Sequence, residues 1–388
     1  MSAGRLPSAA ALMRRAEETT GLSDWGGDLF RRPFEVLIDD LNGEADLHAL
    51  GARRAERRLS DTLTMRLRLV ADRKRFPGIA EEKIERPVFV IGLPRSGTTF
   101  FHNLLSADPA NRSPATWEIM YPSPPPAEAG RDTDPRIAEA EAAMAEVGFL
   151  EEELQAIHPF GARRPEECNF IWELSLLSVN YMAWWHVPNY RKLLYSIDFR
   201  AVYQEHRRVL QHLQHRHRRD RWVLKTPAHM AWLSDLFAVY PDACLIQCHR
   251  DPAKIIPSLS NNLAVWRKTF SDVAPQGDFG MLELQAAGLE NVARFRAQPG
   301  FRDRFFDAHY LKVQADPVAV LKQAYAAFGI PLDTTRMAAI RAWMAHDREG
   351  HAAGARHSYR LADYGLDYAA IDRVMGAYIR TFGVELER

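Results

Sequence analysis

One stretch of the sequence combines residue types and spacings that suit the binding of an anionic group. It runs Pro87-Val-Phe-Val-Ile-Gly-Leu-Pro-Arg-Ser-Gly-Thr-Thr-Phe100 and predicts a buried strand, a turn bounded by Gly92 and Gly97, and the start of a helix. The first N–H groups of a helix have no partner inside it and lie at the positive end of its dipole, so they bind phosphate well. Arg95 within the turn adds a planar cation that suits an oxyanion approached from the side.

The same turn differs from the loop of a nucleotide triphosphatase. Such a loop reads G-x-x-x-x-G-K-[ST], and here Thr98 stands in place of the lysine, which argues against hydrolysis of ATP or GTP. The run His249–Asp251 is a poor match for a protein-kinase catalytic loop, because Ile256 occupies the position where that loop has asparagine. A serine hydrolase is also disfavoured, since Ser96 lies in Pro-Arg-Ser-Gly and not in G-x-S-x-G.

Two further segments place cations where a strand is expected to end. Lys225 closes the expected strand Arg221–Lys225, and Arg250 follows the expected strand Ala243–His249. Parallel sheets bind ligands along the edge where the carboxyl ends of their strands lie. We therefore expect Arg95, Lys225 and Arg250 to converge on one anionic ligand.

These segments resemble those of the sulfotransferases that use 3′-phosphoadenosine 5′-phosphosulfate (PAPS). Gly92–Thr99 is similar to the family's 5′-phosphosulfate loop, in the arginine-bearing form of the bacterial and tyrosylprotein branches. Arg250 and Ser258, eight residues apart, resemble the pair that binds the 3′-phosphate. The resemblance spans roughly residues 86–388. It implies an α/β, P-loop NTPase-like three-layer fold with a central parallel sheet.

The resemblance also implies which residues bind the donor. The loop would hold the 5′ end of the nucleotide, and the pair would hold the 3′-phosphate. Phe100, at the start of the helix, either stacks on the adenine or packs in the core. A basic segment late in the chain resembles the family's loop that covers the nucleotide. Either of its arginines, Arg348 or Arg356, could contact the nucleotide. The implied set is Arg95, Ser96, Gly97, Thr98, Thr99, Phe100, Arg250, Ser258, and Arg348 or Arg356.

The implied chemistry is in-line transfer of a sulfuryl group, which like phosphoryl transfer depends on positioning and on stabilisation of charge. Arg95 and Lys225 would stabilise charge on the sulfuryl and bridging oxygens, and this scheme requires no metal. A base must take the proton of the acceptor. Glu118 matches the glutamate base of the tyrosylprotein branch in position, and His229 is the alternative.

The periodicity of the sequence outlines the elements that position these residues. Residues 1–85 are expected to form a helical N-terminal extension, a cap packed on the core. Residues 86–388 would be the sulfotransferase α/β domain, with acceptor-site insertions around 120–215. Residues 201–219 carry four histidines among arginines, which favours a solvated helix face over a metal site. The other expected elements are strands Val88–Leu93 and Arg304–Leu311, and helices 135–157, Ala228–Tyr240, Pro252–Lys268 and Pro317–Phe328.

Composition limits the partners. The 388 residues carry 50 basic and 50 acidic side chains, so no net charge attracts nucleic acid or a membrane surface. Three cysteines fit a reducing compartment, which we expect to be the cytoplasm. No apolar run approaches the ~20 residues that a membrane-spanning helix needs, so no membrane insertion is expected.

The acceptor is expected to be a hydroxyl or amine of a small molecule or carbohydrate. Its pocket would be built from the Pro122–Pro126 loop, the 150–190 segment and the N-terminal helices, and the aromatic run Phe170–Trp185 either lines it or packs in the core. Two other functions stay open: a P-loop kinase or nucleotide hydrolase, and a nucleotide-binding scaffold without catalysis.

Overall fold

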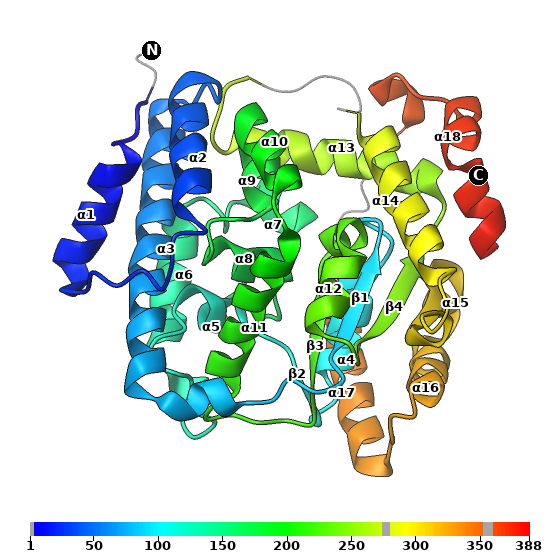
Figure 1. Ribbon diagram of the computed structural model, residues 1–388. Coiled ribbons are helices and arrows are strands. Elements are labelled where there is room, and N and C mark those ends of the chain that lie inside the picture. Colours follow the sequence, from blue (N-terminus) through cyan, green and yellow to red (C-terminus); the bar gives the residue numbers. More distant parts are fainter. Residues whose placement is uncertain (1–3, 274–279, 352–359) are drawn as a thin grey trace. The chain divides into compact units, whose positions relative to one another are not determined.

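The computed structural model describes residues 4–273, 280–351 and 360–388, with the side chains of residues 348–351 left out. The chain forms two compact units (Figure 1). Unit 1 comprises residues 1–84, 114–218 and 263–275, and unit 2 comprises residues 85–113, 219–262 and 276–388. The units are interleaved along the chain, and the expected division at residue 85 into an extension and a family domain stays a prediction.

Unit 1 is helical, as expected for its N-terminal part. Its helices are α1 (Ala9–Thr20), α2 (Arg31–Gly43), α3 (Ala49–Arg75), η1 (Pro77–Glu81), α5 (Thr116–Met120), η2 (Arg131–Thr133), α6 (Arg136–Glu146), α7 (Glu152–Ile157), α8 (Cys168–Glu173), α9 (Asn180–Trp184), α10 (Pro188–Ser196) and α11 (Phe199–Gln214). Helix α13 (Pro252–Lys268) begins in unit 2 and ends in unit 1.

Unit 2 is built on a parallel sheet. Its strands within the described residues are β1 (Val88–Gly92), β2 (Asn111–Arg112), β3 (Arg221–Lys225), β4 (Cys244–His249) and β5 (Phe305–His309), in the order β2-β3-β1-β4-β5, and every neighbouring pair is parallel. The expected α/β class with a central parallel sheet is confirmed. The carboxyl ends of β3 and β4 flank the turn that follows β1, which is the switch point where open α/β sheets bind ligands.

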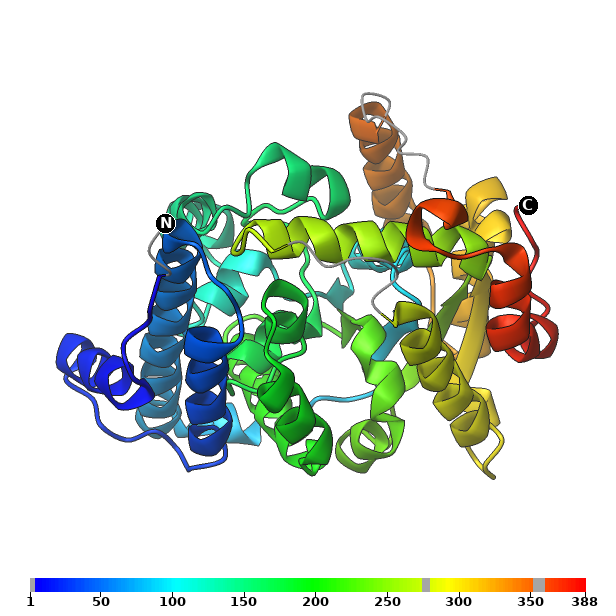
Figure 2. The same ribbon diagram turned by 90° about the horizontal axis from the view of Figure 1, so that it is seen from above.

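Helices cover both faces of this sheet. Val88 and Val90 of β1 pack with α4, α16 and α17 in one core, whereas Phe89 points to the other face and contacts the rings of His229 and Tyr240. The helices of unit 2 are α4 (Thr98–Ser106), η3 (Pro227–Ala231), α12 (Leu233–Val239), α14 (Met281–Arg296), η4 (Arg302–Arg304), α15 (Tyr310–Ala315), α16 (Pro317–Ala327), α17 (Thr334–His351), η5 (Leu361–Tyr364) and α18 (Tyr368–Phe382). Figure 2 shows the same elements from above.

Two expected helices are each divided. The predicted helix 135–157 consists of α6 and α7, because the chain between them turns through Gly148 in the left-handed region at φ 84°. The predicted helix Ala228–Tyr240 consists of η3 followed by α12, since the backbone leaves helical geometry at Trp232 (φ −131°, ψ 42°).

The expectation of a solvated helix face at residues 201–219 is wrong for three of its four histidines. His206, His212 and His217 are buried, and burial lowers the pKa of His206 to about 3 and that of His212 to about 4. The Nε2 of His212 donates to the carbonyl oxygen of Pro122 at 2.9 Å. These rings are therefore packing residues, and the described residues contain no group of His, Cys, Asp and Glu placed to hold a metal ion.

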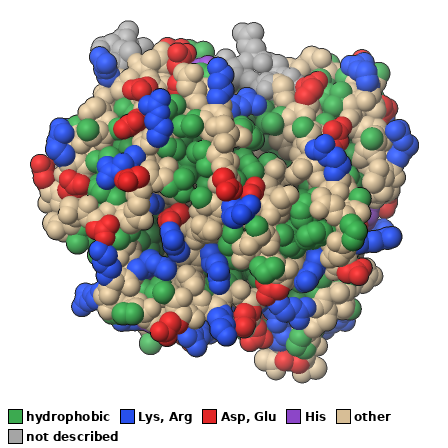
Figure 3. Space-filling view, viewed as in Figure 1, with side chains coloured by type: hydrophobic (Ala, Val, Ile, Leu, Met, Phe, Trp, Pro, Cys, Tyr) green, Lys and Arg blue, Asp and Glu red, His purple; other side chains and the backbone are tan. Residues whose placement is uncertain are grey.

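The surface charge and the hydropathy of the described helices agree with the balanced charge and the lack of long apolar runs in the sequence. On the face shown in Figure 3, lysine and arginine side chains are interspersed with aspartate and glutamate, without a continuous patch of one sign. None of the described helices is both long enough and apolar enough to cross a bilayer.

Candidate active site at the carboxyl edge of the sheet

The turn after β1 has an unusual backbone. Gly92, Arg95 and Gly97 all lie at positive φ, at 132°, 70° and 91°. A Cβ on Gly92 would lie 2.5 Å from the carbonyl oxygen of Cys248 in β4, so only glycine lets the two strands pair here. Ser96 closes the turn, donating from its backbone N–H and from its hydroxyl to the carbonyl oxygen of Leu93 at 3.2 and 2.6 Å. Successive N–H groups in such a conformation form an anion-binding concavity.

Helix α4 begins directly after this turn. Gly97 is its N-cap residue, and among the described residues no side chain caps the helix start. Thr98 is buried there and Thr99 is exposed. An uncapped start of a helix of this length suits an anion, because the first N–H groups would otherwise bond only to water.

Lys225 lies at the end of β3 beside the same helix start. Its side chain is buried, with 2% of the residue exposed, and its Nζ donates to the Oγ1 of Thr99 at 3.2 Å. A buried ammonium group has lost most of its water, so a charge placed near it is stabilised more strongly than in solvent.

Arg95 connects the turn to the end of β4. Its Nε donates to the Oγ of Ser258 in α13 at 3.2 Å, and its carbonyl oxygen accepts from Nη1 of Arg250 at 3.2 Å. Arg95 is exposed, and Ser258 is buried with 6% exposure. The structure thus brings Arg95, Arg250 and Ser258 into direct contact, and Lys225 lies with Thr99 at the start of the same loop's helix.

The remaining expected donor residues lie around this site or outside the described region. Phe100 is half-buried in α4, packs against the core of unit 2 and lies 5.8 Å, ring centre to ring centre, from Trp343 of α17. The backbone of Arg348 belongs to α17, and its side chain is not described. Arg356 lies outside the described residues.

The two expected bases are both buried. The ring of His229 in η3 meets Phe89 of β1 edge-on, with 4.9 Å between ring centres. Glu118 lies in α5 of unit 1 and is 0% exposed. Its Oε2 accepts the N–H of Ala115 at 3.0 Å, and its Oε1 accepts from Nε of Arg131 at 3.4 Å. Which of them is the base stays a prediction.

The regions expected to form the acceptor pocket all fall in unit 1, where the aromatic run packs in a core. Phe170 and Trp184 form part of a cluster of rings with Phe149, Phe160 and Trp266. Core packing therefore accounts for these two residues.

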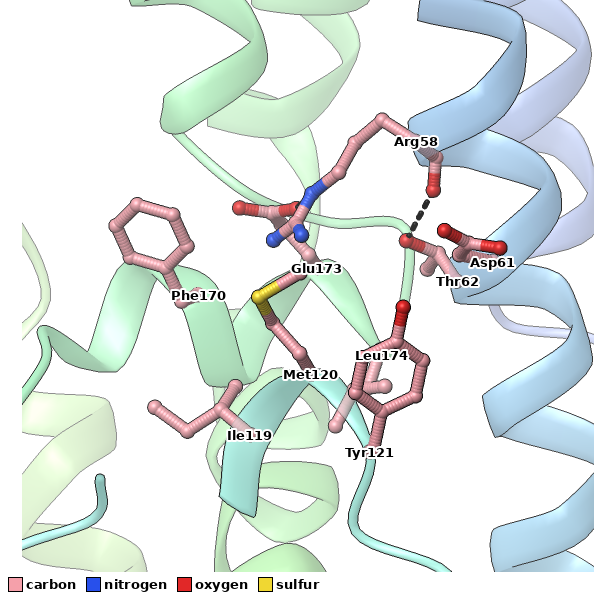
Figure 4. Close-up of a pocket in the computed structure, with 9 residues that line it drawn as sticks. All are labelled: Arg58, Asp61, Thr62, Ile119, Met120, Tyr121, Phe170, Glu173 and Leu174. Carbon is pink, nitrogen blue, oxygen red and sulfur yellow. Dashed lines mark hydrogen bonds and ion pairs between the residues drawn. The ribbon is translucent and has the colours of Figure 1, made fainter. Parts of the chain in front are cut away.

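A buried ion pair borders this ring cluster (Figure 4). Arg58 donates from Nε to Glu173 at 2.8 Å and lies over the Phe170 ring, with its Cζ 5.7 Å from the ring centre. Burial raises the pKa of Glu173, and the charge of Arg58 opposes that rise. The cavity beside the pair measures about 10 Å³, room for about one water molecule and not for an acceptor.

A second hollow in unit 1 is large enough for a small ligand. It measures about 350 Å³ and lies between α3, the end of α8 and α11. Apolar side chains such as Leu69 and Ile171 line it together with the cations Arg66, Arg73 and Arg208.

Two residues that contact Arg250 were not foreseen from the sequence. The Tyr310 ring lies under the guanidinium, with 3.8 Å between Cζ and the ring centre, and Glu387 accepts from its Nε at 2.8 Å. Tyr310 directly follows β5, but the strand was expected to continue to Leu311, so the rule that selected Lys225 and Arg250 at strand ends did not reach it. Glu387 has no local signal, because it lies far along the chain from any strand end.

Comparisons with known proteins agree on one family. The model described as "Sulfotransferase family" matches residues 87–334. The omega-hydroxy-beta-dihydromenaquinone-9 sulfotransferase Stf3 of Mycobacterium tuberculosis is 24% identical over 334 residues, which are 79% of this chain and 78% of that protein.

Two solved structures are also similar. Sulfotransferase STF1 from Mycobacterium tuberculosis H37Rv is 32% identical with a TM-score of 0.81, covering 96% of this chain and 99% of that one. Sulfotransferase STF9 from Mycobacterium avium is 28% identical with a TM-score of 0.88, covering 98% of each chain.

Proposed function

Because this chain belongs to the sulfotransferase family, we propose that it transfers the sulfuryl group of PAPS to a hydroxyl or amine of a small-molecule or carbohydrate acceptor. Family membership assigns the class of reaction and decides against the kinase or nucleotide hydrolase. The P-loop NTPase-like fold of the solved sulfotransferases confirms the fold expected from the sequence. The observation that best supports the donor is the contact of Arg95 with both Ser258 and Arg250.

The residues of unit 2 fit a nucleotide that carries anionic groups at two positions. The uncapped start of α4, with Thr98, Thr99 and the turn before it, would hold the 5′ end. Arg250 and Ser258 would hold a 3′-phosphate. A nucleotide with only 5′ charges, such as ATP, has no use for this second group of donors.

PAPS, when bound, supplies an activated sulfuryl group with a nucleotide bisphosphate as the leaving group. Lys225 and Arg95 would stabilise the negative charge that develops on the bridging and sulfuryl oxygens. Lys225 is suited to this role because it is buried and already directed at the helix start through Thr99. The cationic side chains would replace a metal ion in this scheme.

The acceptor must lose a proton, to Glu118 or to His229. Replacing each by glutamine separates the two: we expect kcat to fall for the base and to change little for the other residue, with donor affinity unchanged in both. The relative Stf3 is named for an omega-hydroxy compound, which favours a hydroxyl as acceptor here too. We propose that residues 120–215 recognise the acceptor and that the protein, whose three cysteines are buried thiols, acts in the cytoplasm.

The proposal is tested by incubating the protein with PAPS labelled in its sulfate, in EDTA, and a panel of aliphatic alcohols, sugars and amines. We expect transfer of label to at least one class of acceptor, and loss of that transfer in Lys225→Met. Binding of the desulfated donor without turnover on any acceptor would indicate a scaffold, and a requirement for magnesium would contradict the metal-free scheme.

A further inference from the structure

The side chain of Arg250 is held in place by the protein on three sides. Its Nε and Nη2 donate to the two carboxylate oxygens of Glu387 at 2.8 and 3.1 Å, and its Nη1 donates to the carbonyl oxygen of Arg95. The Tyr310 ring lies against its face. The same ring packs on the turn after β1, because a Cβ on Gly97 would lie 3.2 Å from it. A long arginine side chain ordinarily explores many rotamers. These contacts select one.

The position of Glu387 is fixed by a hydrogen bond of its own backbone and by an ion pair of the next residue, Arg388. Glu387 belongs to the segment Val384–Arg388 that follows α18, here termed the tail (red in Figures 1 and 2). Its N–H donates to Oδ2 of Asp251 at 2.8 Å, and the other oxygen of that buried carboxylate accepts the N–H of Ala253 at the start of α13. Arg388 forms an ion pair with Asp372 of α18. The tail is therefore tied to the end of β4 on one side and to α18 on the other.

Helix α18 is anchored to the same strand end. The Nε2 of His249, the last residue of β4, donates to Asp307 of β5 at 2.8 Å, and its Nδ1 accepts from the Tyr378 hydroxyl of α18 at 3.2 Å. The His249 ring also stacks on Phe382, with 4.8 Å between ring centres. These contacts hold α18, and with it the tail, at the end of β4.

We infer that Glu387 is a positioning residue for the donor nucleotide, which holds the Arg250 guanidinium ready for the 3′-phosphate. A guanidinium has five N–H donors. The described contacts use three, two on Glu387 and one on Arg95. One N–H on each terminal nitrogen remains for a phosphate, which suits bidentate recognition. The inference rests on the proposed function, since it assigns a role within the proposed donor site.

Two effects of Glu387 oppose each other. Its negative charge repels the incoming phosphate, and its contact removes the cost of ordering Arg250 on binding. The Arg250 guanidinium would lie between the two anions, and its positive charge offsets their repulsion. Ordering a long side chain at the moment of binding weakens affinity by about three- to tenfold. Preorganisation therefore outweighs repulsion, and the tail strengthens binding of the bisphosphate.

The test compares Glu387→Ala and Glu387→Gln with the matched tail variant Glu385→Gln, whose residue is exposed. Isothermal titration measures the affinity for 3′-phosphoadenosine 5′-phosphate (PAP) and for 5′-AMP, which lacks the 3′-phosphate. We expect Glu387→Ala to weaken the binding of PAP about three- to tenfold and to leave the binding of 5′-AMP unchanged. The affinity of Glu387→Gln for PAP should lie between those of Glu387→Ala and the unaltered protein. Glu385→Gln should bind PAP as the unaltered protein does. Thermal unfolding without ligand shows that each variant is folded.

Each other outcome overturns the inference. Tighter binding of PAP by Glu387→Ala would make the carboxylate a competitor of the phosphate. Equal weakening of PAP and 5′-AMP would mean that the tail only supports the fold. A third outcome is that the unaltered protein prefers PAP over 5′-AMP, that Arg250→Ala abolishes this preference, and that Glu387→Ala leaves it unchanged. In that case the inference fails and the proposed donor survives. If the unaltered protein does not prefer PAP, both fail.

Discussion

Substitution of Gly92 tests whether the close pairing of β1 and β4 builds the donor site. In Gly92→Ala the new Cβ would lie 2.5 Å from the carbonyl oxygen of Cys248 and 3.1 Å from its nitrogen. These are backbone atoms inside a sheet, so they yield only if the strands separate. The residue also sits at φ 132°, which an alanine adopts with strain. Strained backbone costs about 1–3 kcal/mol and overpacking about 1–3 kcal/mol, so we expect a loss of about 2–6 kcal/mol in the free energy of unfolding.

Gly288→Ala is the matched control, since it also adds one methyl group in unit 2. Its Cβ would meet only the Met230 side chain at 3.8 Å, an ordinary contact, and Gly288 lies within helix α14. We expect it to stabilise the protein by about 0.5–1 kcal/mol. Denaturant unfolding followed by circular dichroism measures both. Where Gly92→Ala remains folded, we also expect weaker PAP binding, because separating the strands moves the turn away from Arg250. A Gly92→Ala protein as stable as Gly288→Ala would refute the reasoning.

Three further predictions concern charges in or near the core. Burial lowers the pKa of His212 to about 4, whereas a histidine in an unfolded chain has a pKa of about 6.5. Between these pH values the unfolded state binds more protons than the folded state, so the free energy of unfolding falls as the pH drops from 7 to 5. In the unaltered protein this loss in the free energy of unfolding is roughly 2 kcal/mol between pH 7 and pH 5, and we expect His212→Asn to remove it. His186→Asn, at an exposed position, should leave the pH dependence of the free energy of unfolding unchanged. If both variants show the same dependence on pH, the prediction is wrong. Arg336→Met should destabilise unit 2 by about 3–5 kcal/mol in denaturant unfolding, because it leaves the fully buried Asp108 carboxylate without its ion pair, and a loss under 1 kcal/mol would contradict the account. Lys225→Met should lower kcat about 100- to 1,000-fold in the labelled-sulfate assay with a smaller change in donor affinity, and an unchanged kcat would exclude its proposed role.

Local sequence signals predicted the elements that build the donor site. The strands β1, β3, β4 and β5 were expected within one or two residues of their ends, because short apolar runs bounded by glycine, proline or charged residues identify buried parallel strands. The rule that ligands bind at carboxyl strand ends then selected Lys225 and Arg250.

The parts that were missed depend on tertiary contacts. His206 and His212 lie among arginines in sequence, and only the packing of α11 inside unit 1 shows that their rings are buried. The break at Gly148 requires a left-handed residue that helical periodicity alone does not reveal. Glu387 acquires its position through α18 and Asp251, contacts that join residues far apart in the chain.

The central claim is that unit 2 binds one nucleotide through its 5′ end and its 3′-phosphate together. Isothermal titration of the unaltered protein and of Arg250→Ala with PAP and with 5′-AMP tests this most directly. The account predicts at least tenfold tighter binding of PAP than of 5′-AMP by the unaltered protein, and nearly equal binding of the two by Arg250→Ala, since a charge-assisted hydrogen bond to phosphate contributes about 1.5–3 kcal/mol. Equal affinity of the unaltered protein for the two nucleotides would contradict it.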